Sequence, residues 1–215
     1  MDFPTPPLEA AAPEPLTRGH KKRERTRRGL MDAALRLVAR KEVGEIALFE
    51  VAAEAAVSNG TIYNYFRTRD EVLEAVGIAM AAEFSDAISV LSTDVQCGAQ
   101  RLSIGVRMFV CRAAADHQWA NALLRIIHYD QAMRSRLADH VLGDLRAGLR
   151  EGIFTYEEEG IALDMVVSCT TGAMRAIVEG RAVLEHDVRV AEMILQALGV
   201  TPPKARKIAA KPLPA

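Results

Sequence analysis

Apolar residues recur at helical spacing along almost the whole chain, and no stretch alternates apolar and polar residues as a β-strand would. The first pattern lies in TRRGLMDAALRLVARK and predicts an amphipathic helix from about Arg25 that ends before Gly44. A short helix is expected over residues 48–56. Longer helices are expected over residues 69–91, 97–115, 117–128, 130–151, 160–181 and 187–199. The pattern therefore predicts an all-α protein.

The segment VSNGTIYNYF, residues 57–66, predicts a third short helix with two different faces. At about 100° per residue, Ile62 and Phe66 fall about 40° apart and would dock inward. Gly60, Thr61 and Asn64 point the other way. Ser58 is placed as the N-cap of this helix, about three residues after the preceding helix. Two short helices joined in this way are a helix-turn-helix unit, whose second helix can enter the major groove of DNA.

The charge of the chain is uneven. Net charge is −1, but residues 18–70 carry +5 and the rest carries −6. The densest run is RGHKKRERTRR, residues 18–28, with seven basic residues and one acidic residue. Such a run is either a solvated helix start or a basic arm that binds a polyanion such as DNA.

Other bulk features point to a cytoplasmic globular protein. No apolar run is long enough to span a membrane, and the N-terminus lacks the pattern of a secretory signal. Residues 1–17 hold five prolines and predict a disordered lead-in. Cys97, Cys111 and Cys169 are widely spaced without a CxxC pair, so they are interpreted as buried thiols, with no disulfide framework and no metal site.

The segments ALRLVARK, VAAEAAVSNGTIYNYF and RTRDEVLEAV resemble, in order and spacing, the N-terminal domain of tetracycline-repressor-like (TetR family) transcriptional regulators. The resemblance covers about a quarter of the chain. It implies a helix-turn-helix domain over residues 18–68 and an effector-binding and dimerisation domain over residues 69–201, followed by a tail at 202–215. It also implies that Thr61, Tyr63 and Arg69 contact DNA phosphates, and that Asn59, Gly60, Asn64 and Tyr65 lie where family members contact bases or backbone.

The chain departs from the family pattern at three places. Ile46 and Ala47 stand where Thr or Ser commonly opens the second helix, Ala56 stands at the usual glycine of the turn, and Phe49 occupies a position that is often basic. The apolar positions that set the fold are kept.

The resemblance further implies that the last two long helices pair with their copies in a dimer. Small and apolar residues follow one side of ALDMVVSCTTGAMRAIVEG, and a buried helix within one chain would show the same pattern. The residues predicted for the interface are Met165, Val166, Cys169, Ala173, Ala176 and Ile177.

A ligand cavity is expected among the helices of the second domain. The residues predicted to line it are Phe84, Met108, Phe109, Cys111, Trp119, His128, Tyr129 and Met133. Each could equally fill the core. Together they would suit an apolar cavity with a few hydrogen-bonding groups. His117 and His128 are eleven residues apart, but no carboxylate completes a metal-ligand spacing, so no metal or cofactor is expected.

The sequence gives little support to an enzyme, because it contains no GxGxxG, GxxxxGK, HExxH or GxSxG motif. It indicates a homodimeric repressor that binds a palindromic DNA operator and is released by a small apolar or aromatic effector. The alternative is a helical small-molecule binding or catalytic protein whose N-terminal helices are only structural. A salt-dependent gel shift separates the two.

Overall fold

The computed structural model describes residues 18–38, 40–41, 43–126 and 136–214, and within these ranges it contains helices and no strand. The first helices are α1 (Arg18–Val38), the short 3-10 helix η1 (Val43–Glu45), α2 (Leu48–Glu54) and α3 (Asn59–Tyr63). Then follow α4 (Arg69–Leu91), α5 (Gly98–Ala115), α6 (His117–Ile126) and α8 (Arg136–Arg150). The chain closes with α9 (Glu159–Val178), α10 (His186–Ala197) and α11 (Pro202–Ala209). The predicted all-α fold is confirmed.

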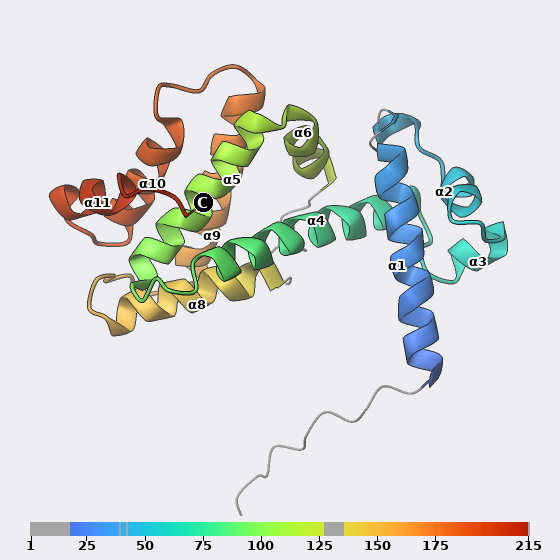
Figure 1. Ribbon diagram of the computed structural model, residues 1–215, viewed down its shortest axis with the longest axis horizontal. Coiled ribbons are helices and arrows are strands. Elements are labelled where there is room, and N and C mark those ends of the chain that lie inside the picture. Colours follow the sequence, from blue (N-terminus) through green and yellow to red (C-terminus); the bar gives the residue numbers. More distant parts are fainter. Residues whose placement is uncertain (1–17, 39, 42, 127–135, 215) are drawn as a thin grey trace, which may run out of the picture.

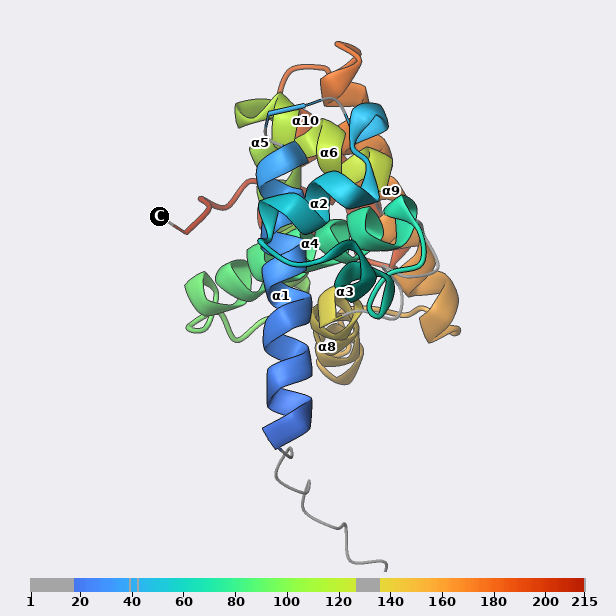
Figure 2. The ribbon, with the colours of Figure 1, turned by 90° about the vertical axis from the view of Figure 1, so that its right-hand side faces the viewer.

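A small N-terminal core holds α1, α2, α3 and the start of α4 together (Figures 1 and 2). Leu30, Val51, Ile62 and Val72 are fully buried there and come from the four helices in turn. α1 begins at Arg18, well before the expected start near Arg25, so the basic run is helical. α3 ends at Tyr63, earlier than expected, and Phe66 is buried from the turn that follows.

A larger core lies among α5, α8, α9, α10 and α11. α5 and α8 approach closely at Gly98, where an added Cβ would lie 2.6 Å from the backbone nitrogen of Gly148. α9 is long and apolar enough to cross a membrane by length and composition. It packs against α5, α8 and α10, however, and core helices pass the same test.

The segment expected as a tail, residues 202–215, instead contains α11, which packs against α10 and α5. Its two prolines occupy the first helical turn, where a missing backbone N–H costs nothing. Ala205, Ile208 and Ala209 are buried at the spacing of one helix face. Residues 202–209 are therefore a packed helix and not part of a tail.

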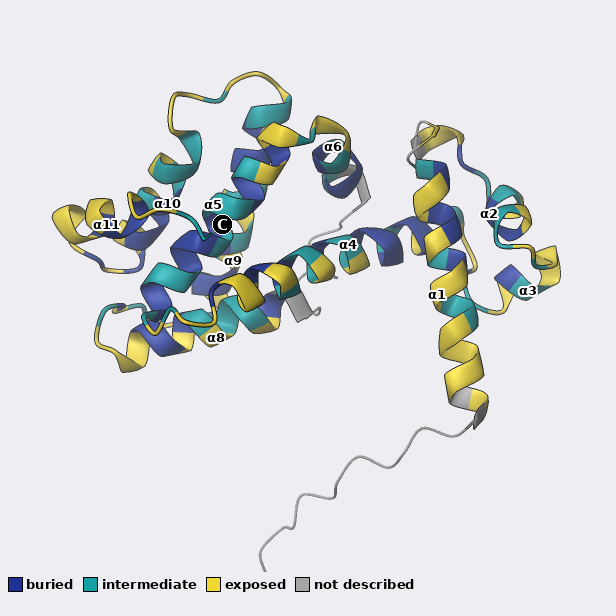
Figure 3. Cartoon of the chain, in the orientation of Figure 1, coloured by how far each residue is buried: buried dark blue, intermediate teal, exposed yellow. Residues whose placement is uncertain are grey.

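α4 links the two cores (Figures 1 and 3). Val72 and Val76 in its first half belong to the N-terminal core, while Ala81 and Ile88 in its second half belong to a third cluster shared with α5, α6 and α9. Thr68 caps the helix by accepting a hydrogen bond from the Glu71 backbone N–H at 3.2 Å. One continuous helix therefore joins the domain that carries α3 to the domain formed by the later helices.

Candidate functional site

The orientation of α3 is set by a cap at one end and two anchors on its inner side. The Ser58 hydroxyl accepts a hydrogen bond from the Thr61 backbone N–H at 3.2 Å and lies 2.8 Å from the Thr61 hydroxyl. Ile62 and Phe66 are buried in the N-terminal core. The N-cap and the inward pair match the expectations from the sequence. The opposite face of the helix is consequently turned outward.

The turn between α2 and α3 carries backbone strain. Ala56 has a φ of 53°, in the left-handed region that is costly for a residue with a Cβ atom. The Val57 N–H closes the turn by donating to the Ala52 carbonyl at 3.0 Å. The turn thus keeps the geometry for which glycine is usual, although alanine occupies it.

Replacing Ala56 by glycine is expected to raise the free energy of unfolding by about 0.5–1 kcal/mol, because relief of left-handed strain exceeds the entropy cost of glycine. Urea denaturation measures the change. Ala55→Gly is the control, since Ala55 has a φ of −83° and the substitution relieves no strain. That control should lose stability, and equal losses in both variants would contradict the interpretation of the turn.

The outer face of α3 is small and polar around one large side chain. Asn59, Gly60 and Asn64 are exposed, and Tyr63 is 59% exposed. A Cβ at Gly60 would have only the Ser58 hydroxyl within 4 Å, at 3.9 Å, so this position leaves open space above the helix. Thr61 and Tyr65 are half-buried. A surface of this kind can accept a close approach by another molecule and offer it hydrogen-bonding groups.

Arg69 is partly engaged within the protein. Its guanidinium donates to the Gly44 carbonyl at 3.0 Å and to the Asp70 carboxylate at 2.9 Å. The side chain therefore ties the start of α4 to the loop between α1 and α2. About two fifths of the side chain remains exposed.

Ion pairs clamp α2 onto α1. The Glu54 carboxylate accepts from Arg36 at 2.8 Å and from Arg40 at 2.7 Å, while Glu50 pairs with Lys41. These contacts lower the pKa of both carboxyl groups below their ordinary values. A carboxyl group whose pKa is lowered by folding stabilises the folded state at pH values above its ordinary pKa. This stabilisation is lost as the pH falls through the lowered pKa. The clamp is thus fully formed at neutral pH.

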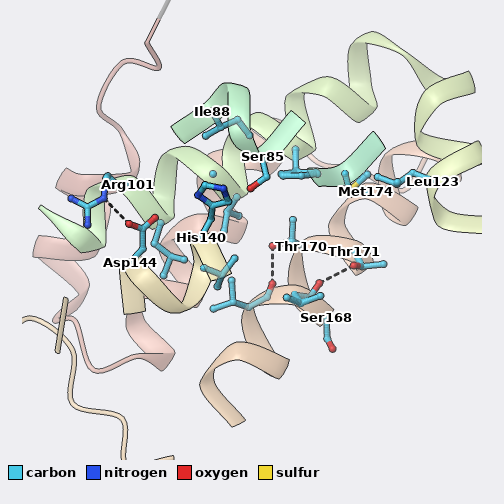
Figure 4. A pocket seen from close by; sticks show the side chains of 18 of the residues that line it. Ser85, Ile88, Arg101, Leu123, His140, Asp144, Ser168, Thr170, Thr171 and Met174 are labelled. Carbon is cyan, nitrogen blue, oxygen red and sulfur yellow. Dashed lines mark hydrogen bonds and ion pairs between the residues drawn. The ribbon is translucent and has the colours of Figure 1, made fainter. Parts of the chain in front are cut away.

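A cavity of about 480 Å³ lies among α4, α5, α6, α8 and α9 (Figure 4). Most of its wall is apolar. The apolar lining residues are Ala81, Ile88, Leu102, Val106, Phe109, Leu123, Leu124, Val141, Val166, Val167 and Met174. This size and composition suit a small organic molecule.

Charged and titratable groups from α5 and α8 form one part of the cavity wall. Arg101 Nε donates to the Asp144 carboxylate at 2.6 Å, and the same guanidinium donates to the carbonyls of Val95 and Gln96. His140 Nε2 lies 2.8 Å from the Asp86 carboxylate. Burial raises the pKa of the Asp144 carboxyl above its ordinary value, and Arg101 opposes that rise. The two carboxylates thus already have basic partners within the protein.

Thr170 and Thr171 can only accept hydrogen bonds from a molecule in the cavity. The Thr170 hydroxyl donates to the Val166 carbonyl at 2.7 Å, and the Thr171 hydroxyl donates to the Val167 carbonyl at 2.8 Å. Their hydroxyl hydrogens are used within α9 (Figure 4). The remaining lone pairs can accept hydrogen bonds from a ligand.

Of the residues predicted for the pocket, Phe109 lines this cavity. Phe84, Met108 and Trp119 lie in the adjoining hydrophobic cluster, where the ring centroid of Phe84 is 4.9 Å from that of Phe109 and 5.4 Å from that of Trp119. They fill space beside the cavity. Cys111 is absent from the cavity wall, and its thiol pKa is raised by burial with Asp187 close by. The predicted His128, Tyr129 and Met133 lie outside the described residues.

Sequence reasoning missed the polar wall of the cavity. Ser85 and Ser89 line it from α4, and Ser92 lines it from the C-cap of this helix, at spacings of four and three that place all three on one helix face. The spacing of these serines could have been recognised from the sequence. The facing positions of Arg101 and Asp144 carried none, because these residues are 43 positions apart in the sequence.

The residues predicted as a dimer interface on α9 differ in how far they are buried within the chain. Val166, Ala173 and Ala176 are buried within the chain, with Val166 only 2% exposed. Met165 and Ile177 are half-buried and Cys169 is exposed. The buried three pack into the core of their own chain and cannot also form the surface of an interface. The exposed apolar residues of these last helices are instead Ile161, Cys169 and Met193. Cys169 is thus not the buried thiol that was expected.

Within the described residues, no group of His, Cys, Asp and Glu side chains could hold a metal ion. The structure thus has two separate features: the exposed outer face of α3, and a cavity in the later helices that suits a small organic molecule. α4 connects them. Comparison with known proteins identifies the architecture.

The family model described as "Tetracyclin repressor-like, C-terminal domain" matches residues 98–211, more than half of the chain. The model for bacterial regulatory proteins of the tetR family matches residues 30–76. The chain belongs to the TetR family. It is therefore a transcription regulator of the TetR kind, with a DNA-binding N-terminal domain and a ligand-binding C-terminal domain, and members of this family are DNA-binding regulators rather than enzymes.

Solved structures agree with this TetR assignment. RolR in complex with resorcinol is 27% identical, covering 91% of this chain and 98% of that chain with a TM-score of 0.72. The TetR family repressor FadR from Thermus thermophilus, in complex with lauroyl-CoA, is 20% identical over 81% of this chain and 96% of that chain, with a TM-score of 0.62. The FadR likeness concerns the fold alone. Among curated proteins, no relative matches the chain.

Proposed function

We propose that this TetR regulator is a cytoplasmic, homodimeric repressor that binds a palindromic operator and releases it when a small effector fills the cavity. The observation that carries the proposal is the continuity of α4. Its first half is packed in the N-terminal core with α3, and its second half lines the cavity through Ser85 and Ile88. A ligand that shifts the second half also shifts the domain that carries α3.

The reading of DNA is assigned to the outer face of α3. The exposed residues Asn59, Gly60, Tyr63 and Asn64 face the groove, with Thr61 and Tyr65 at its edge. Arg69 contacts a phosphate from the start of α4. Two copies of α3 must meet half-sites about 34–36 Å apart, so a modest change in their separation lowers affinity for the operator.

The proposed effector is a small, neutral molecule, either a hydroxylated aromatic compound or one that is similarly apolar. An apolar wall favours an uncharged ring, since burying an unpaired charge is expensive. Thr170 and Thr171 use their hydroxyl hydrogens within α9 and therefore offer acceptors, while Arg101 Nε and Nη1 already have partners. Hydroxyl groups on the ring can donate to these two acceptors. That RolR, at 27% identity, binds resorcinol supports this class.

The test is a gel shift with duplex DNA from the intergenic region next to the protein's own gene. Wild-type protein should retard a duplex that contains a palindrome, and resorcinol or a related dihydroxybenzene should release it. Lauroyl-CoA serves as the contrasting probe, because its phosphates carry charge that the cavity does not match. Release by the acyl-CoA alone would overturn the effector class, and no retardation of any palindrome would overturn the DNA assignment.

The dimer is assigned to exposed apolar residues on α9 and α10. Ile161 is 69% exposed and Met193 is 71% exposed, so both large apolar side chains are free to be covered by a partner copy. In a two-fold dimer the same patch meets its own copy, so a charge placed there is duplicated across a dry interface.

Met193→Arg combined with Ile161→Arg is therefore expected to convert a dimer into a folded monomer at micromolar concentration. Light scattering measures the mass, and circular dichroism checks the fold. Val90→Arg is the control, because Val90 is equally exposed but lies on α4. Val166→Glu would be uninformative, since Val166 is buried within its own chain. If the wild-type protein proved to be a monomer, the assignment of a dimer interface to α9 and α10 would be wrong.

A further inference from the structure

The N-terminal turns of α1 project beyond the rest of the domain (Figures 1 and 2). Among the residues of this helix whose exposure the structure describes, Leu30 is the first that is buried, and the twelve helical positions before it extend for about 18 Å at 1.5 Å per residue. Lys21, Lys22, Arg25 and Arg28 are exposed along it (Figure 3). The hydrophobic core therefore does not explain why this segment is kept as a helix.

The charges on this segment oppose helix formation. Residues 18–28 carry seven basic side chains and one acidic one, and the first turn has no acidic residue. Cations are unfavourable at a helix N-terminus, and like charges three or four positions apart, as in Lys21 and Arg25, repel each other. In the described part of the chain, no ion pair joins Lys21, Lys22, Arg25 or Arg28 to a carboxylate. The positive charge is thus left for an outside partner.

Two arginines of the same segment hold it beside α3. The Arg23 guanidinium lies 5.8 Å from the ring centroid of Tyr65, and that of Arg27 lies 5.3 Å from that of Phe66. Tyr65 and Phe66 come immediately after Asn64, the C-cap of α3. Lys21, Arg25 and Arg28 lie on the other, exposed side of the same helical turns. The contacts of Arg23 and Arg27 therefore fix where these turns lie relative to α3.

We propose that the N-terminal turns of α1, residues 21–28, bind the phosphate backbone of DNA beside the groove that α3 enters. The proposal rests on the proposed function and adds a second DNA-contacting element outside the helix-turn-helix unit. The partner is double-stranded DNA because four exposed cations within about two helical turns, on a helix that contacts the residues after α3, can neutralise several phosphates. Contacts of this kind add affinity and salt dependence without sequence preference.

The experiment uses the full chain with Lys21→Ala, Lys22→Ala and Arg25→Ala combined. Alanine favours the helix, so circular dichroism should show no loss of helicity. The probes are two fluorescein-labelled 40-base-pair duplexes, one from the intergenic region next to the protein's own gene and one of unrelated sequence. Anisotropy titrations from 50 to 200 mM salt give the dissociation constant and its salt slope. Lys204→Ala, Arg206→Ala and Lys207→Ala on α11 form the control, with the same change of net charge at exposed positions.

The α1 variant should reduce the salt slope by about two to three and raise the dissociation constant about tenfold to several hundredfold at 100 mM salt. Both duplexes should lose affinity equally, whereas the control should match wild type. An unchanged salt slope, or an equal loss in the control, overturns the proposal while leaving the assignment of α3 intact. Absence of salt-dependent binding by the wild type overturns both.

Discussion

Replacing Gly105 by leucine is expected to abolish the response to the effector and to leave DNA binding unchanged. Gly105 lines the cavity from α5, and no atom lies within 4 Å of an added Cβ, so the leucine side chain grows into the space where the ligand would lie. Leucine also favours a helix over glycine, so the unliganded protein should gain rather than lose stability.

Thermal shift with resorcinol and related dihydroxybenzenes measures the effect. A ligand at 100 times its dissociation constant adds about 2.7 kcal/mol to the free energy of unfolding, and this gain should disappear in the variant. Gly143→Leu is the matched control, because Gly143 lies on α8 with open space around it and outside the cavity wall. If the Gly105 variant kept the full shift while the fold was intact, the ligand would have to bind elsewhere.

Substitutions on α3 are expected to separate affinity from sequence preference. Tyr63→Ala removes an exposed side chain assigned to a phosphate, so it should weaken binding about equally on all duplexes. Asn64→Ala removes a side chain assigned to a base edge. Its loss should reduce discrimination between operator and unrelated DNA by about 1–3 kcal/mol, or roughly five- to 150-fold.

Anisotropy titrations on operator and unrelated duplexes measure both quantities. Val90→Ala is the control, because it also removes an exposed side chain, at the far end of α4. The same loss and the same preference in both α3 variants would refute the division of roles. Arg69→Ala is less informative than the sequence suggested, since it also breaks the hydrogen bond to the Gly44 carbonyl.

The helix-turn-helix unit could be predicted because its determinants are local. The spacing of Ile62 and Phe66 fixes which side of α3 faces inward, and Ser58 fixes where the helix starts. The backbone of the turn could not be predicted in detail, because alanine at position 56 gives no local sign of a left-handed conformation. The surrounding packing enforces it.

The cavity was harder to predict because it forms where the side chains of five packed helices leave a space between them. Periodicity shows which face of a helix points inward, but it does not show whether the opposite helix fills the space. Aromatic residues such as Phe84 and Trp119 were natural candidates, yet they are large enough to close the space around them. On α9 both faces are apolar, so its pattern could not distinguish Val166 in the core from the exposed Cys169.

The continuity of α4 also limits how regulators of this design can exchange modules. Val76 belongs to one core and Ala81 to the next, so any junction between a foreign reading domain and this sensor must fall within a helix, near Ile78. One inserted residue there would turn the two modules by about 100° and move them 1.5 Å apart, whereas seven residues make nearly two full turns. Recombination between such regulators must therefore conserve the length of this segment as strictly as its sequence.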